Sequence, residues 1–165
     1  GYNAMNKLTG RKTIIGHKKE DKGQYDIPLY THGAYSGAMM IRKSVIEQTG
    51  MLPRNFFIYF DDSDVSARIL KNGYKILYQP KAVVYNRASL LPSEKSAINV
   101  YYRTRNRILF MRRNSNLLQF SIFLSFFFFL TIPATTTKFL IKRQFTHLQS
   151  FFKGIWWNVK MRAAA

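Results

Sequence analysis

The feature that most constrains how this chain folds is an apolar, phenylalanine-rich stretch at residues 117–132. Four phenylalanines follow one another at 126–129, and Pro133 ends the stretch. A helix of sixteen residues is about 24 Å long, which is short for a bilayer core of about 30 Å. Pro133 predicts an interruption of the helix. The stretch is therefore typical of a segment that enters a membrane without simply crossing it.

Basic residues lie on both sides of this stretch. Five arginines precede it between residues 103 and 113, and Lys138, Lys142 and Arg143 follow it. A single spanning helix usually carries its positive residues on one side only. We therefore expect a re-entrant or in-plane segment with both ends on the cytoplasmic face of the membrane. A true span and the core helix of a soluble domain are the alternatives, and the phenylalanine run argues against the second.

Charge and composition support a membrane partner. The chain has 165 residues, enough for about one domain, with 26 Lys and Arg against 8 Asp and Glu, a net charge of +18. Most of the excess lies after residue 86, where basic residues and phenylalanines occur together. This combination favours an anionic membrane surface over nucleic acid. The absence of cysteine excludes disulfides and Cys-based zinc sites.

Two further basic segments surround the apolar stretch. Residues 145–160 alternate phenylalanine and tryptophan with Lys153 and Lys160, as in a helix lying at a membrane interface. Residues 95–113 combine tyrosines with arginines, which would also permit contacts to RNA or DNA. Because no nucleic-acid-binding motif accompanies them, we consider nucleic acid an unlikely partner.

Short strands and helices are expected in the N-terminal half. Residues 1–32 read as a long loop with at most short strands. Gly37, within a small-apolar run, indicates a strand over 34–41 with close approach of backbone or ligand. A helix from Ser44 to Gln48 ends at Gly50. The remaining expected elements are a strand ending at Asp61, a helix at 65–71 closed by Gly73, strands at 74–78 and 82–85, and a helix at 93–113. This order predicts an α/β layered fold.

Three of the eight acidic residues lie close together, at Asp61, Asp62 and Asp64. Like charges held close together repel, which costs free energy, unless a cation or metal neutralises them. Such clusters are also typical of sites that transfer protons. They lie at the expected junction of strand and helix, where α/β proteins place their chemistry. A structural alternative stays open: Asp62 or Ser63 caps the helix, and Asp64 pairs with Arg68 one turn later.

The chain resembles the family 2 glycosyltransferases over roughly residues 20–113. Residues 32–42, His-Gly-Ala-Tyr-Ser-Gly-Ala-Met-Met-Ile-Arg, are similar to a family strand that reads Gly-Ala-x-Met-Leu-Ile-Arg-Arg. Residues 57–68 are similar to Phe-x-Tyr-x-Glu-Asp-x-Asp-x-x-x-Arg, and 73–85 to Gly-Tyr-x-Ile-x-Tyr-x-Pro-x-Ala-x-Val. Residues 101–106 resemble the Tyr-Tyr-x-x-Arg-Asn that follows the catalytic domain. Each motif is weak alone, but four occur in the family's order.

The resemblance implies an inverting, rhamnosyltransferase-like enzyme with the GT-A fold, whose Rossmann-like sheet binds a nucleotide-sugar donor. The acceptor would be a hydroxyl of a cell-envelope glycan or a lipid-linked glycan. Asp62 matches the family's general base, which must be ionised and within hydrogen-bond reach of the acceptor. Asp61 stands where the family more often has Glu and would support the base. The expected substrate-binding residues are Gly37, Asp64, Arg68 and Arg105.

Two departures from the family pattern concern the metal ion. The family's nucleotide-binding strand and metal-binding Asp-x-Asp precede the matched region, and no Asp-x-Asp occurs before Gly33. We therefore expect this chain to be the C-terminal part of a longer protein, with ligands for Mg²⁺ or Mn²⁺ mostly upstream. Many members have His where this chain has Asn86, a poorer ligand, so either the metal is held upstream alone or this member has a weakened metal dependence. We expect no metal ligand within this segment, and expect it to be inactive alone.

The sequence thus predicts two parts. Residues 1–92 would be the acceptor side of a GT-A catalytic domain, and residues 93–165 a basic, helical, membrane-associated region. A non-catalytic membrane-binding module, with the α/β part as a platform for a partner, is the alternative. Because half a sheet leaves an open edge, we also expect poor solubility.

Overall fold

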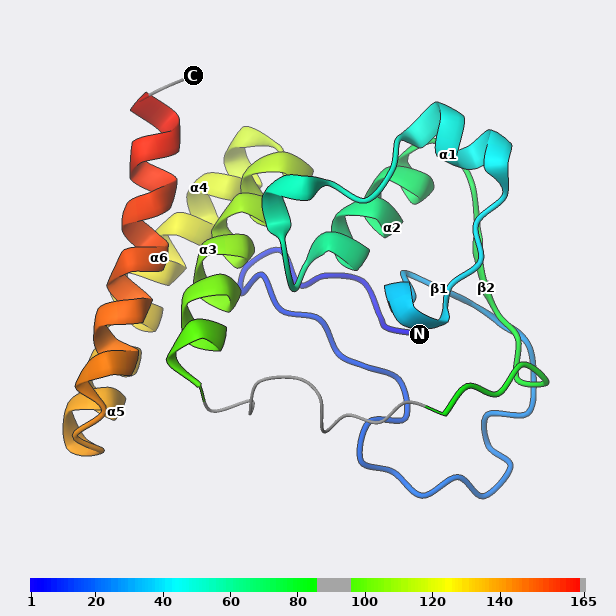
Figure 1. The fold of residues 1–165 in the computed structure, drawn as a ribbon, viewed down its shortest axis with the longest axis horizontal. Helices are drawn as coiled ribbons and strands as arrows, with labels where there is room; N and C mark the ends of the chain where they lie inside the picture. The colour runs from blue at the N-terminus through cyan, green and yellow to red at the C-terminus, as the bar shows by residue number, and fades with distance from the viewer. Residues whose placement is uncertain (86–95, 164–165) are drawn as a thin grey trace. The chain divides into compact units, whose positions relative to one another are not determined.

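The computed structural model describes residues 1–85 and 96–163, which form two compact units (Figure 1). The first unit contains Gly1–Met5, Lys12–Phe57 and residues 61–85. The second contains Asn6–Arg11, Ile58–Phe60 and residues 96–163. The expected boundary at residues 92 and 93 lies outside the described residues.

The first unit is a mixed α/β structure, which confirms the expected class. Strand β1 (Leu29–Thr31) pairs antiparallel with β2 (Ile76–Tyr78), with Leu29 opposite Tyr78. Helices α1 (Lys43–Thr49) and α2 (Asp61–Lys71) accompany them, with short 3₁₀ turns at Ser36–Ala38 and Arg54–Phe56. Among the described residues this two-stranded sheet is the whole sheet structure. It is much smaller than the layered sheet that the sequence predicts.

Three expected strands are wrong. Residues 36–38, inside the predicted strand at 34–41, form a 3₁₀ turn. Gly37 is exposed there, and a Cβ added to it would meet no atom within 4 Å, so no close approach explains this glycine. Residues 82–85 have no regular structure and are exposed. A strand is stable only beside another strand, and no described strand lies next to either segment.

The segment before Asp61 is also not a strand. After the 3₁₀ turn, Phe57, Tyr59 and Phe60 have φ angles of 62°, 64° and 68°. Residues with side chains rarely adopt this region of backbone conformation. The apolar character of these residues predicted a strand, but their backbone turns repeatedly instead of being extended. Asn106 of the second unit contacts this segment, as described below.

The two helices of the first unit largely confirm the predicted ones. Helix α1 begins at Lys43 after Arg42, without a side-chain cap, so the cap expected from Ser44 is wrong. It ends at Gly50, whose φ of 79° suits glycine. Helix α2 begins at Asp61, earlier than expected, and Gly73 follows its end with φ 82°. Val45 of α1 packs with Val65 and Ile69 of α2 to form the core.

The second unit is helical. Its elements are α3 (Ala97–Asn114), α4 (Leu117–Phe126), the π-helical turn Phe127–Thr131, α5 (Ile132–Ile141) and α6 (Phe145–Ala163). Side chains cap two of the helices: Ser96 accepts the N–H of Asn99, and Asn116 accepts that of Gln119. The predicted helix at 93–113 is confirmed from Ala97 onward, whereas Ser96 is an extended cap residue outside the helix.

Pro133 does not interrupt the apolar helix, contrary to expectation. Helices α4 and α5 join through the π turn into one helix of 25 residues, Leu117–Ile141. Within the turn the N–H of Ile132 bonds to the carbonyl of Phe127, five residues back. Such a turn changes the hydrogen-bond pattern where a proline has no N–H to donate. The apolar helix is therefore long enough to cross a bilayer, contrary to what its sixteen most apolar residues suggested.

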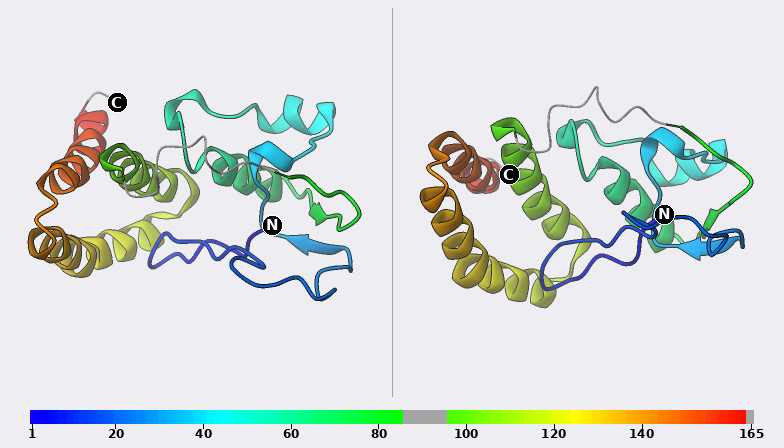
Figure 2. Two further views of the ribbon diagram at one scale, coloured as in Figure 1. Left: turned by 60° about the horizontal axis from the view of Figure 1, so that its bottom comes forward. Right: turned by 90° about the horizontal axis from the view of Figure 1, so that it is seen from below.

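Helices α3 and α6 lie side by side (Figure 2). A Cβ at Gly154 would lie 2.8 Å from the carbonyl oxygen of Tyr101, so only glycine allows this approach. The Asn158 side chain donates to the carbonyl of Arg105 at 2.9 Å. Phe151, on the same face, lies against Phe127 with ring centres 6.2 Å apart.

Candidate functional site

The three clustered carboxylates lie in the first turn of α2 in the first unit. Asp62 and Asp64 are buried, with 6% and 0% of their surface exposed, whereas Asp61 is half-buried. The N-terminal end of a helix attracts negative charge, which explains part of the clustering. Asp62 and Ser63 lie inside the helix, so neither is the cap residue that the structural alternative expected.

Asp62 is held by a lysine that is distant in sequence. The Lys12 ammonium lies 3.1 Å from Oδ2 and 3.3 Å from Oδ1 of Asp62, and 2.8 Å from Oγ of Ser63. The same carboxylate accepts the Ser63 N–H at 2.6 Å. Burial lowers the pKa of Lys12, and the charge of Asp62 partly offsets this. The carboxylate is thus fixed on one side by a cation.

Tyr2 completes the surroundings of this ion pair. Its hydroxyl donates to Oγ of Ser66 at 3.0 Å, and the Lys12 ammonium lies 3.8 Å from its ring centre. Burial raises the pKa of Tyr2, and the charge of Asp62 adds to the effect. Tyr2 and Lys12 come from segments joined by a β-bridge between Tyr2 and Ile14. No spacing in the sequence indicates that these residues meet Asp62, so sequence reasoning missed both.

Asp61 differs from its neighbours because it is partly open to solvent. Burial raises its pKa, and the negative charge of Asp62 raises it further, while Lys12 acts in the opposite direction. Two adjacent carboxylates with unlike surroundings can take different protonation states. This arrangement is compatible with the expected support of Asp62 by Asp61.

Asp64 and Arg68 form a pair that joins two helices. Nε of Arg68 lies 3.1 Å from Oδ2 of Asp64, which confirms the predicted pairing one turn apart. The guanidinium also donates to the carbonyls of Thr49, Gly50 and Met51 at the end of α1. These contacts give Arg68 the role of fixing α2 against α1. Substrate binding by either residue stays a prediction.

The other expected site residues lie elsewhere in the chain. Gly37 is in the 3₁₀ turn of the first unit, whereas Arg105 belongs to α3 in the second. The Arg105 guanidinium lies 4.1 Å from the ring centre of Trp157, inside the contact of α3 with α6. Asn86 lies outside the described residues. The structure therefore brings together Asp61, Asp62, Asp64 and Arg68 on one helix.

Asn106 is the last residue of the Tyr-Tyr-x-x-Arg-Asn motif. Within the second unit it holds the segment Ile58–Phe60, which precedes α2. Its side-chain amide donates to the carbonyls of Ile58 at 2.6 Å and Tyr59 at 2.9 Å. The Arg103 guanidinium lies 4.8 Å from the ring centre of Tyr59. Phe60 contacts Phe110 with ring centres 5.7 Å apart. Two residues of the motif region thus hold the segment that runs into Asp61 along the chain.

The described residues do not fit a metal ion. Among residues 1–85 and 96–163, no three His, Cys, Asp or Glu side chains are grouped so that they could hold one. The nearest approach to such a group is the cluster on α2, where ammonium and guanidinium groups already contact Asp62 and Asp64. A metal held by residues outside this chain stays a prediction, and none is used in the chemistry below.

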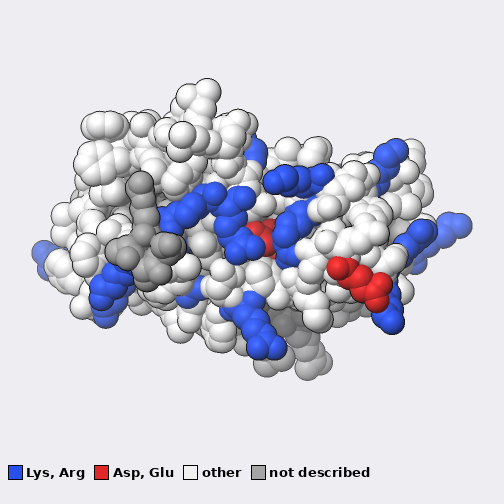
Figure 3. All heavy atoms as spheres, turned by 90° about the horizontal axis from the view of Figure 1, so that it is seen from above, with Lys and Arg blue, Asp and Glu red and all other residues white. Residues whose placement is uncertain are grey.

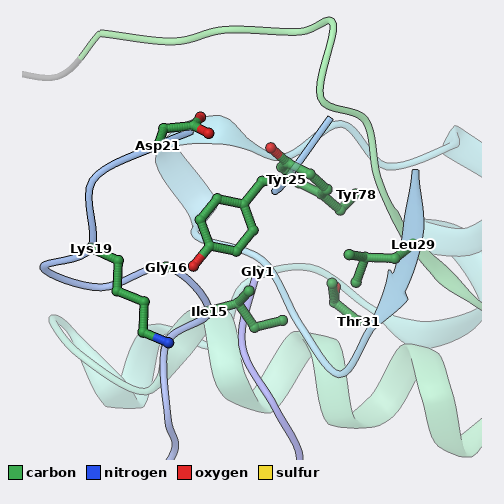
Figure 4. A pocket seen from close by; sticks show the side chains of 9 residues that line it. All are labelled: Gly1, Ile15, Gly16, Lys19, Asp21, Tyr25, Leu29, Thr31 and Tyr78. Atoms are coloured by element: carbon green, nitrogen blue, oxygen red, sulfur yellow. The ribbon is translucent and has the colours of Figure 1, made fainter. Parts of the chain in front are cut away.

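A small pocket of about 220 Å³ also lies in the first unit (Figure 4). Tyr25 extends across it, Tyr78 lies beside it, and Lys19 and Asp21 flank it. Ile15, Leu29 and Thr31 form its floor. Gly1 also lines it. Aromatic rings with polar groups around them are suited to small polar ligands.

The described part of the second unit contains many cations and no acidic residue. Arg107 is buried between Phe123 and Phe127, 5.6 Å and 5.2 Å from their ring centres, and donates to the carbonyl of Thr9. Burial, with repulsion from Arg11, lowers the pKa of Arg107 to about 10. Among the charged side chains visible on the face in Figure 3, Lys and Arg predominate over Asp and Glu, although most of that face is uncharged.

Within the described residues, one helix is long and apolar enough to cross a membrane by length and composition, namely Leu117–Ile141. Phe123, Phe127 and Phe139 are buried on one of its faces, whereas Phe128, Phe129 and other apolar side chains are exposed. Helix α6 exposes Phe145, Phe152 and Trp156, although Phe151 and Trp157 lie against the rest of the unit.

Comparison with known proteins finds no matching family model, no matching curated protein and no matching solved structure. The function is therefore argued from the residues and contacts described above.

Proposed function

We propose that this chain carries the acceptor side and the catalytic base of an inverting glycosyltransferase that works at a membrane. The single observation that carries the proposal is the environment of Asp62. This buried carboxylate at the start of α2 is held by Lys12 and Ser63, and it lies in the segment that resembles the family's base. Under this proposal the first unit belongs to a domain with the GT-A fold.

The reaction is a single displacement. The acceptor hydroxyl gives its proton to a carboxylate oxygen of Asp62 while its oxygen forms a bond to the anomeric carbon of the donor. The bond between that carbon and the diphosphate breaks, and the nucleoside diphosphate leaves with the electron pair. Attack from the face opposite the leaving group inverts the configuration. The structure contributes a fixed, ion-paired carboxylate to this step.

The second unit would hold the enzyme at the cytoplasmic face of an anionic membrane, near a lipid-linked or cell-envelope glycan acceptor. An in-plane position suits the apolar helix better than a span. Gly10 and Arg107 lie against Phe123, and Arg107 also lies against Phe127, so irregular backbone and a cation accompany the first turns of the helix. At membrane depth such groups would have to be covered completely by protein, whereas an in-plane helix leaves them on the polar side of the membrane surface. The exposed Phe128 and Phe129 would enter the outer part of one leaflet.

The proposal is tested by transfer assays on the full-length protein in membranes. Release of nucleoside diphosphate is measured over a panel of sugar nucleotides, with Asp62→Asn beside the natural protein. We expect one donor to turn over and the variant to lose activity by about 10²-fold or more, the range for a positioned base. Asp26→Asn, which removes an exposed carboxylate of the same unit, is the matched control and should keep full activity.

A non-catalytic membrane-binding module is the second candidate, favoured by the exposed apolar side chains and the lack of acidic residues in the described second unit. It predicts binding to anionic vesicles with no turnover of any donor. Transfer that survives in the Asp62→Asn variant would instead leave the enzyme class intact and assign the base to another residue, with Asp61 the next to substitute.

A further inference from the structure

We infer that Lys12 is the positioning residue of this site: it holds the Asp62 carboxylate in the orientation that proton transfer needs. The inference rests on the proposed function, because it assigns Lys12 a role in the same reaction. Lys12 lies 50 residues from Asp62 in sequence, and no part of the sequence resemblance includes it.

The geometry of the ammonium group carries the inference. An ammonium has three N–H donors, and Nζ of Lys12 has three oxygen atoms in reach, two on Asp62 and one on Ser63. Contact with both oxygens of the carboxylate fixes its rotation about the side chain. The Tyr2 ring lies under the ammonium at 3.8 Å and the Tyr35 ring at 5.4 Å. The lysine is therefore itself held in place.

A comparison with the neighbouring ion pair separates this role from a purely structural one. Asp64 has no exposed side-chain surface, and its partner Arg68 also donates to backbone carbonyls of α1. The Asp62 side chain keeps 9% exposure and that of Lys12 keeps 19%. The Lys12 ammonium donates only to side-chain oxygens at the start of α2 among its hydrogen bonds within the described residues. Of the two carboxylates, only that of Asp62 keeps exposed side-chain surface for a substrate hydroxyl to meet.

The charges around Asp62 act in opposite directions. Lys12 is the cation that contacts it, while Asp61 beside it is a like charge. Tyr2 faces the site from the N-terminal segment, and Tyr35 faces Lys12. Asp64 lies on the same helix and is engaged by Arg68. Lys12 is therefore the group that fixes the Asp62 carboxylate from outside α2.

The test is the rate of transfer by the full-length protein in membranes, for Lys12→Met, Lys12→Arg and the natural protein. We expect Lys12→Met to lower kcat by about tenfold or more, because the base loses the contact that fixes its orientation. The KM for the donor should change by less than about threefold, because Lys12 acts on the base rather than on donor binding. Lys12→Arg, which keeps the cation, should restore most of the natural kcat.

Lys22→Met is the matched control, because it removes an exposed lysine paired with the exposed Glu20. It should leave kcat and KM unchanged. A kcat of Lys12→Met equal to that of the natural protein would overturn the inference while Asp62 stays the base. A loss of kcat that is not restored by Lys12→Arg would also overturn it. Full activity of Asp62→Asn would instead remove Asp62 from the role of base and leave the enzyme class intact.

A second measurement does not depend on activity. Thermal unfolding of Lys12→Met, Asp62→Asn and the double variant forms a cycle that reports whether the two side chains interact. We expect the loss of melting temperature in the double variant to be smaller than the sum of the losses in the two single variants. Strict additivity of the losses would overturn the contact on which the inference depends.

Discussion

Asp64 and Arg68 lie one turn apart on α2, with Nε of Arg68 3.1 Å from Oδ2 of Asp64. The carboxylate has no exposed side-chain surface, and the guanidinium reaches from it to the carbonyl of Thr49, the last residue of α1, and to those of Gly50 and Met51 just after it. One arginine therefore balances a buried charge and satisfies the end of a neighbouring helix. The position of α2, and with it that of Asp62, depends on this pair.

Removal of the arginine should strongly destabilise the first unit. Arg68→Ala leaves the Asp64 carboxylate buried without its cation, which costs about 3–5 kcal/mol of unfolding free energy. Asp64→Asn should cost less, because the arginine keeps its bonds to the α1 carbonyls. Urea unfolding of both variants measures the difference. A loss below about 1 kcal/mol for Arg68→Ala, the scale of an exposed pair, would contradict the structural role.

Asp61 should make stability depend on pH. Its raised pKa means that the folded chain holds the proton more tightly than the unfolded chain. Stability from this group is therefore greatest below the ordinary aspartate pKa of about 3.9 and falls as the pH rises through the raised value. Asp61→Asn removes this loss, so it should raise the melting temperature at pH 7 and have no such effect near pH 3. The exposed Asp26→Asn serves as the control for net charge, and an equal gain in both variants would contradict the prediction.

Substitution of Phe57 by glycine should raise the stability of the protein. Its φ of 62° and ψ of −59° are unfavourable for a residue with a side chain, and 74% of its surface is exposed. Relief of such a conformation gives about 1–3 kcal/mol, against about 0.5–1 kcal/mol for the added freedom of glycine in the unfolded chain. Thermal unfolding of Phe57→Gly should therefore show a net gain. Phe57→Ala removes the ring but keeps the Cβ and should show no gain; equal behaviour of the two would refute the argument from backbone strain.

The membrane position of the apolar helix can be tested by cysteine labelling, because the chain has no cysteine. Ser115→Cys and Lys142→Cys place one thiol at each end of Leu117–Ile141. An in-plane helix predicts that a membrane-impermeant maleimide labels both from the cytoplasmic side, while Phe129→Cys is protected. Labelling of the two ends from opposite sides would establish a span.

Helices could be predicted from the sequence better than strands. Gly50 and Gly73 mark helix ends through local backbone chemistry, so α1 and α2 lie close to where the pattern placed them. The strands at 34–41 and 82–85 failed because a strand depends on a partner that local sequence does not reveal. The predicted interruption at Pro133 failed for a different reason, because the π turn before the proline changes the hydrogen-bond pattern of the helix.

The candidate site could be predicted only in part. Asp61, Asp62, Asp64 and Arg68 lie within eight residues, and helical spacing alone placed the last two together. Lys12 and Tyr2 reach Asp62 from the N-terminal segment through a β-bridge at Ile14. Contacts at a separation of 50 residues or more leave no periodic signal in a single sequence.

The interleaving of the two units has a consequence for synthesis. Thr9 accepts its hydrogen bond from Arg107, 98 residues later, although the residues on either side of Asn6–Arg11 belong to the other unit. At about 5–20 residues per second, a ribosome needs on the order of 5–20 s to make the intervening chain. The segment Asn6–Arg11 therefore lacks its contacts with α3 until α3 has left the exit tunnel of the ribosome. Neither unit can be released by cutting the chain at one point. The second unit is completed only after translation has passed the apolar helix, whereas the described residues of the first unit end at residue 85.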